Sequence, residues 1–176
     1  MRKNLFLWQL TALTFTAVFG TLFHFLFDWT GIIAFAPFCA VNESTWEHMK
    51  IFFFPLLIFG FIQYQFFKND YPQFWCIKCV GIVLGTTLIP ILFYTYNGAF
   101  GRSPDWLNIL FFFLSAVLSL SIEYLLFKKD ILPSKRPLWA ILLLLLGSLL
   151  FIIFTFLPLR LPLFQDPING SYGLLQ

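Results

Sequence analysis

Five apolar runs, each long enough to cross a lipid bilayer, constrain this chain more than any other feature. They cover about residues 5–27, 51–67, 75–96, 106–127 and 138–157. A hydrocarbon core about 30 Å thick takes roughly 20 residues of α-helix, because each residue adds about 1.5 Å. Only 11% of the residues are charged, against about a quarter in soluble proteins. We therefore predict an all-α integral membrane protein with five transmembrane helices in one membrane domain, residues 1–176.

The distribution of Lys and Arg predicts the orientation, because basic residues in short loops stay on the cytoplasmic side. With the N-terminus inside, eight basic residues fall on the cytoplasmic side and three outside. The eight are Arg2, Lys3, Lys68, Lys78, Lys128, Lys129, Lys135 and Arg136, and the three are Lys50, Arg102 and Arg160. We predict that the N-terminus lies in the cytoplasm and that the C-terminal tail, residues 158–176, lies outside.

The net charge of +3 does not indicate a nucleic-acid-binding protein. The basic residues are scattered at the ends of apolar runs and form no dense patch with interleaved aromatic side chains. We expect the lipid bilayer, and no nucleic acid, as the partner of this chain. The sequence leaves open whether the chain forms a homo-oligomer or binds a membrane partner protein.

Residues able to bind a metal or transfer a proton gather on the predicted outer side. Five of the eight acidic residues and both histidines fall there. They are Asp28, Glu43, Glu47, Asp105, Asp166, His24 and His48. This clustering is the strongest indication of function in the sequence.

The densest polar segment covers residues 42–50 and is expected to begin the second helix. On a helix, Glu43 and Glu47 are four residues apart and share a face, so they repel unless a cation lies between them. Either Lys50 or a bound ion could supply that charge. Alternatively, Ser44 and Glu47 match a capping box and Asn42 is a good N-cap, and a capped helix start needs no ligand.

His24 and Asp28 end the first run, also four residues apart. Because the connection to the second run is short, we expect them to converge with Glu43, Glu47 and His48 in one outward pocket. Nitrogen and oxygen ligands of this kind suit a divalent metal such as zinc. The predicted metal ligands are His24, Glu43, Glu47 and His48. The predicted ligand-binding residues are His24, Asp28, Asn42, Glu43, Glu47, His48, Gln165 and Asp166.

Two further predictions concern the fourth run and the tail. Glu123 lies near Lys128 at the end of the fourth run. We interpret it as a side chain that extends to the cytoplasmic interface. The tail is too apolar and too rich in turn residues for a solvated end. We expect it to fold back so that Gln165 and Asp166 border the pocket.

Three segments resemble those of a known family. They are His24-x-x-x-Asp28, the segment of residues 42–50 with its Asn-Glu-Ser-x-Trp-Glu-His pattern, and the tail with Pro162–Pro167 and Gly170-x-Tyr172-Gly173. Together they resemble a family of small bacterial polytopic membrane proteins known only as a domain of unknown function. The resemblance implies a multi-pass protein of the bacterial cytoplasmic membrane, and it implies no activity.

Three functions follow as hypotheses. The first is a membrane protein with an outward-facing site for a cation or a small polar ligand. The second is a membrane-embedded metal-dependent hydrolase or transferase acting on lipid-linked substrates, with a metal-activated water and a remaining glutamate as base. The third is a structural or accessory membrane subunit without a site.

Overall fold

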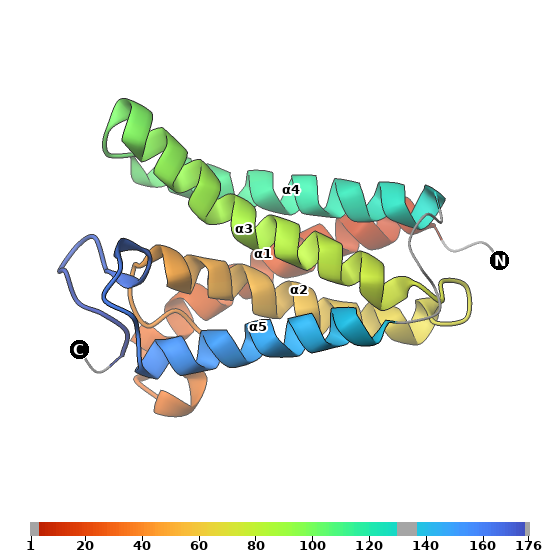
Figure 1. The fold of residues 1–176 in the computed structure, drawn as a ribbon, viewed down its shortest axis with the longest axis horizontal. Coiled ribbons are helices and arrows are strands. Elements are labelled where there is room, and N and C mark those ends of the chain that lie inside the picture. Colours follow the sequence, from red (N-terminus) through yellow and green to blue (C-terminus); the bar gives the residue numbers. More distant parts are fainter. Residues whose placement is uncertain (1–3, 130–136, 175–176) are drawn as a thin grey trace.

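The computed structural model describes residues 4–129 and 137–174, and within these ranges it contains five long α-helices (Figure 1). These are α1 (Leu5–Thr30), α2 (Thr45–Phe67), α3 (Phe74–Phe100), α4 (Asp105–Lys129) and α5 (Leu138–Phe156), with short 3-10 helices η1 (Ile33–Phe35) and η2 (Pro162–Phe164). All five long helices are long and apolar enough to cross a membrane, which confirms the predicted class of fold. Their ends agree with the predicted runs within a few residues, except that α2 begins at Thr45 instead of residue 51.

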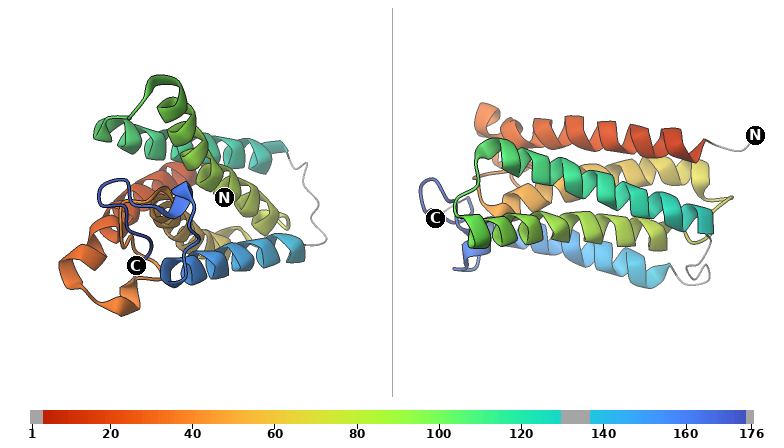
Figure 2. Two further views of the ribbon diagram at one scale, coloured as in Figure 1. Left: turned by 60° about the vertical axis from the view of Figure 1, so that its left-hand side comes forward. Right: turned by 90° about the horizontal axis from the view of Figure 1, so that it is seen from above.

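The helices form one elongated bundle in which successive helices run in opposite directions (Figures 1 and 2). Helix α2 packs against α1, α3 and α5, while α4 packs against α3 and α1. We call the end of the bundle that carries residues 157–174 the tail end. At this end α1, α3 and α5 finish and α2 and α4 begin, so residues from all five helices can meet there.

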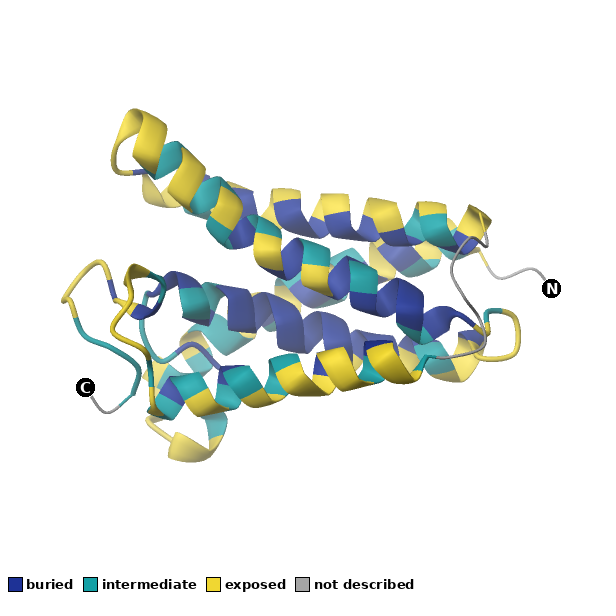
Figure 3. Ribbon diagram, viewed as in Figure 1, coloured by how far each residue is buried: buried dark blue, intermediate teal, exposed yellow. Residues whose placement is uncertain are grey.

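The distribution of exposed side chains fits a lipid environment. Helix α2 has the largest share of buried residues, and α1 and α5 have the smallest (Figure 3). Rows of leucine, isoleucine and phenylalanine on α1, α4 and α5 face outward. Soluble proteins rarely expose continuous apolar patches beyond a few hundred Å². The outer surface of this bundle is therefore suited to acyl chains.

A buried ion pair joins α3 to α4 inside the bundle. The Nζ atom of Lys78 donates to Oε2 of Glu123 at 2.8 Å, and both side chains are fully buried. Gln9 of α1 donates to the same carboxylate oxygen at 3.2 Å. The prediction that Glu123 extends to the membrane interface is wrong, because its partner lies on the neighbouring helix. A Cβ atom at Gly81 would collide with Glu123, so this glycine permits the close approach of α3 and α4.

Candidate metal site at the tail end of the bundle

The start of α2 is fixed by two short side chains. Ser44 is the N-cap, and its Oγ accepts from the backbone N–H of Glu47 at 3.4 Å. The side chain of Asn42 accepts from the N–H of Ser44 at 2.9 Å. The Ser44 bond of the predicted capping box is thus present. Because α2 begins at Thr45, Glu43 lies just before the helix. The expectation that Glu43 and Glu47 share a helical face is wrong for this reason.

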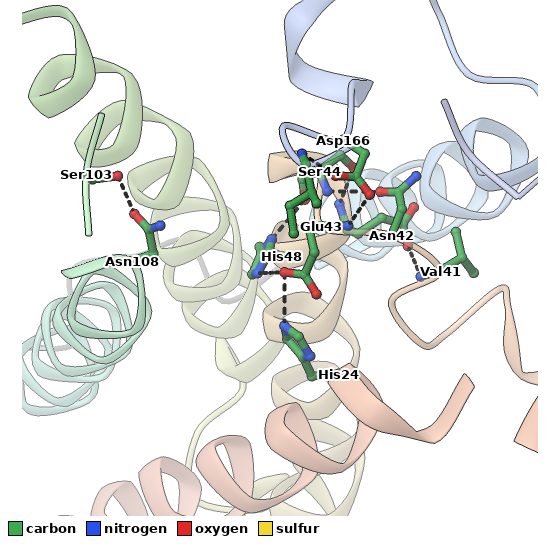
Figure 4. A network of polar contacts seen from close by, with 11 residues as sticks. His24, Val41, Asn42, Glu43, Ser44, His48, Ser103, Asn108 and Asp166 are labelled. Atoms are coloured by element: carbon green, nitrogen blue, oxygen red, sulfur yellow. Dashed lines mark hydrogen bonds and ion pairs between the residues drawn. The ribbon is translucent and has the colours of Figure 1, made fainter. Parts of the chain in front are cut away.

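Glu43 instead lies between the two histidines (Figure 4). Its Oε2 atom is 3.6 Å from Nε2 of His24, near the end of α1, and 3.6 Å from Nε2 of His48, in the first turn of α2. The three side chains offer ligand atoms within 4.8 Å of one another. Three of the four predicted metal ligands therefore form one group, and we call His24, Glu43 and His48 the metal group.

Backbone geometry orients the ring of His48. Its Nδ1 atom lies 2.9 Å from the carbonyl oxygen of Ser44. A carbonyl only accepts, so Nδ1 carries the proton and the Nε2 of the neutral ring presents a lone pair toward Glu43. Metal-binding histidines typically donate their second ring N–H in this way. No such bond fixes His24, whose Nδ1 is buried and has no hydrogen-bond partner within residues 4–129 and 137–174.

The environment keeps Glu43 in its ionised form. Interaction with the His24 ring lowers the pKa of Glu43 below its ordinary value, while burial opposes this effect. The carboxylate is half-buried and therefore remains accessible to a small ion. A carboxylate at neutral pH is the form that a metal requires.

A cavity of about 590 Å³ lies beside this group and is lined by α1 to α4 and the tail. Its deeper walls are apolar, with Ile51, Ile89 and Phe112 among the lining residues. The polar lining residues other than the metal group come mainly from the end of α3 and the start of α4. They are Asn97, Arg102, Ser103, Asp105 and Asn108.

Asn97, Ser103 and Asn108 form a hydrogen-bonded cluster on the side of the cavity opposite the histidines. Asn97 donates to Ser103 Oγ at 3.1 Å, and Ser103 donates to Oδ1 of Asn108 at 2.7 Å. Figure 4 shows Ser103 and Asn108 on the α3–α4 side, facing His48 and His24. These three residues were not predicted as site residues. Their only signal was polar side chains beside a turn between two apolar runs.

Glu47, the fourth predicted metal ligand, is a structural residue. It is buried, forms an ion pair with Lys50 and accepts from the N–H of Val41 at 3.1 Å. The ammonium group of Lys50 also donates to the carbonyl of Ala36 and to Thr155 of α5, each at 2.8 Å. All three donors of Lys50 are thus used. The pair ties α2 to α5 and to the connection before α2, and Glu47 is not part of the metal group.

The tail folds back over the start of α2, as predicted, and it braces the site without joining the metal group. Asp166 accepts from the N–H of Glu43 at 3.3 Å, and Asn42 donates to the carbonyl of Gly173 at 3.2 Å. Gln165 is exposed and pairs through its backbone with Tyr172. Pro167 and Ile168 are the tail residues that line the cavity. The predicted pocket residues Gln165 and Asp166 therefore belong to its support.

Asp28 also lies outside the metal group. Its side chain is exposed one turn beyond His24. The carboxylate that His24 meets is Glu43, and the ligand set that the described residues bring together is His24, Glu43 and His48.

Comparison with known proteins places the chain in a family. No curated protein matches the chain, and no solved structure matches it. The family of unknown function DUF6512 matches residues 2–174, which is nearly the whole chain. Five apolar helices together with this match identify the chain as a member of DUF6512 with the character of a multi-pass membrane protein.

Proposed function

We propose that this protein binds a divalent metal ion, with zinc as the first candidate, through His24, Glu43 and His48. One observation carries the proposal. The Nε2 lone pair of His48 faces a carboxylate oxygen of Glu43 across 3.6 Å, although both atoms are acceptors when the ring is neutral. A cation between two such acceptors removes their repulsion and uses both lone pairs.

The two histidine–glutamate separations fit zinc chemistry. Zinc bonds of about 2.0–2.2 Å in a tetrahedral site place neighbouring ligand atoms about 3.3–3.5 Å apart. Both histidine–glutamate distances, 3.6 Å, are close to that value. Two imidazoles and one carboxylate form a ligand set that zinc accepts, and three protein ligands leave a position for water or a bound molecule.

A metal-dependent hydrolase or transferase is the second candidate, and the open fourth position supports it. Catalytic zinc sites typically use three protein ligands, His₂Glu among them, and a water. The hypothesis needs a remaining glutamate as base, but Glu47 is already paired with Lys50. Besides Glu43, the carboxylate that lines the cavity within the described residues is Asp105. An enzyme would therefore need Asp105 as its base.

Metal analysis of purified variants tests the metal site. We expect about one zinc ion per chain in the wild type after equilibration with zinc and removal of excess ion. Glu43→Gln keeps the shape of the side chain but removes the charge, and we expect zinc affinity to fall by on the order of 100-fold or more, since even residues behind the ligands contribute 10–100-fold. His48→Ala should have the same effect.

Asp28→Asn is the matched control, because Asp28 is an exposed carboxylate one turn from His24 and outside the ligand group. This variant should bind zinc like the wild type. A folded wild type that takes up no zinc would contradict the proposal and favour an accessory subunit whose histidines share a proton with Glu43.

We further infer that the tail end faces outward in a bacterial cytoplasmic membrane and that the N-terminus lies inside. Lys78 and Lys50 are buried in ion pairs and drop out of the count of interfacial charges. Seven basic residues against two then remain in favour of this orientation. Four of the seven, Arg2, Lys3, Lys135 and Arg136, lie outside the described residues and are assigned by sequence alone.

Two exposed asparagines at opposite ends of the bundle, Asn69 and Asn169, offer matched positions for a test of orientation. Each is changed to cysteine in a chain whose buried cysteines, Cys39, Cys76 and Cys79, are replaced by serine or alanine. An impermeant maleimide added to intact cells should label Asn169→Cys and should label Asn69→Cys only after lysis. The reverse pattern would refute the outward orientation.

A further inference from the structure

We propose that the metal site takes an amphiphile from the bilayer, with an anionic oxygen head group at the metal and an acyl chain along the apolar wall of the cavity. This inference rests on the proposed metal site and names the class of ligand that the site receives. Three features of the cavity support it: its depth, its side opening and the charges at its polar end.

The cavity reaches below the ends of the helices. Thr21 lies nine residues before the end of α1, and Phe113 lies eight residues after the start of α4, and both line the cavity. At about 1.5 Å per residue, these positions are roughly 12–14 Å from the helix ends. The headgroup layer is only about 5–8 Å thick on each side of the hydrocarbon core. The apolar part of the cavity therefore lies at the depth of acyl chains.

The cavity is also open to the side. Phe25 of α1 and Ile109 and Phe113 of α4 line it and are at the same time exposed on the outer surface of the bundle. Figures 1 and 2 show the end of α3 and the start of α4 leaning away from α2 and α5 at the tail end. A chain in the outer half of the bilayer can thus enter between α1 and α4 without crossing water.

The polar end of the cavity favours an anionic head group. Arg102 carries a fixed positive charge, and Asn108 has an amide group whose oxygen already accepts from Ser103. The amide nitrogen of Asn108 has no hydrogen-bond partner within the described ranges 4–129 and 137–174, so it can donate to a ligand. A divalent metal with one carboxylate ligand and two neutral histidines keeps a net positive charge, and together with Arg102 it outweighs the single carboxylate of Asp105, which lines the same end of the cavity. Phosphate and carboxylate oxygens can bind Arg102, the amide of Asn108 and the metal, since arginine and metals both bind such groups.

Photolabelling with two probes tests this inference and distinguishes a carboxylate head group, as in a fatty acid, from a phosphate head group, as in a phospholipid. The probes are a palmitic acid with a diazirine near the chain end and a phosphatidic acid that carries the same chain. The protein is held with zinc in nanodiscs of phosphatidylcholine, irradiated and digested. We expect label on the peptides around residues 20–25 of α1 and 109–113 of α4. The probe that labels more efficiently identifies the head group, and the methyl ester of the fatty acid should label only at background.

A tryptophan that fills the side opening should abolish this labelling. Ile109→Trp places an indole in the cavity wall, and the matched control is Leu110→Trp, which is also exposed but does not line the cavity. Thr21→Trp with its control Val18→Trp repeats the comparison on α1. Labelling should be lost in the two cavity variants and kept in the two controls, and all four should retain zinc.

The outcomes distinguish this inference from the metal site. Zinc binding with label that is spread evenly over the exposed helices, and unchanged in Ile109→Trp, would overturn the amphiphile and leave the metal site intact. Labelling that depends on Ile109 in a protein that takes up no zinc would support the lipid cavity and refute the metal site.

Discussion

Replacing Lys78 with alanine is expected to lower the free energy of unfolding by about 3–5 kcal/mol. The change leaves the carboxylate of Glu123 fully buried between α3 and α4, with Gln9 as its one remaining donor among the described residues. An uncompensated buried charge is among the most destabilising defects in a protein. Unfolding in mixed micelles with increasing sodium dodecyl sulfate, followed by circular dichroism, measures the loss.

Two further variants make this prediction specific. Lys129→Ala removes an exposed lysine from the end of α4 and should change stability by less than about 0.5 kcal/mol. The double variant Lys78→Met and Glu123→Gln removes both charges and keeps an oxygen acceptor for Gln9, so we expect it to recover most of the loss. If Lys78→Ala were no more harmful than Lys129→Ala, the pair would contribute nothing to the packing of α3 on α4.

The sequence predicts well where the helices of this protein lie along the chain, and it predicts poorly which helices pack against each other. An apolar run of about 20 residues in a chain with few charges has essentially one solution, a membrane-spanning helix, because lipid offers no other partners for backbone groups. The same property hides the packing. Faces toward lipid and faces toward other helices are both apolar, so periodicity does not reveal which side of α4 meets α3. In the sequence, Lys78 and Glu123 therefore look like separate charges near the ends of their runs, and nothing shows that they form an ion pair.

The candidate site was predicted in part, and the reason lies at the start of α2. His24, Glu43 and His48 form the group that the sequence suggested, whereas Glu47 does not. The spacing argument assumed that Glu43 lies on the helix, but the N-cap Ser44 places it before the first turn. Asn97 and Asn108 were missed because they reach the cavity from another pair of helices, and no local pattern links them to the histidines.

The second large effect is a contrast between two glutamates that are only four residues apart. Glu47→Ala leaves the ammonium of Lys50 fully buried without its charged partner, and we expect a loss of stability of about 3–5 kcal/mol. Glu43→Ala removes a side chain that is 38% exposed and paired with two histidines, so its effect should stay within about 1 kcal/mol. Both values come from the same unfolding measurement.

Zinc binding should separate the two variants in the opposite order. Under conditions in which both are folded, Glu47→Ala should keep its zinc because it contributes no ligand, whereas Glu43→Ala should lose it. Equal loss of stability in the two variants, or loss of zinc from folded Glu47→Ala, would contradict this division. The division has a physical basis in the N-cap: Ser44 starts the helix between the two glutamates, so that one points to the cavity beside the histidines and the other into the core beside Lys50.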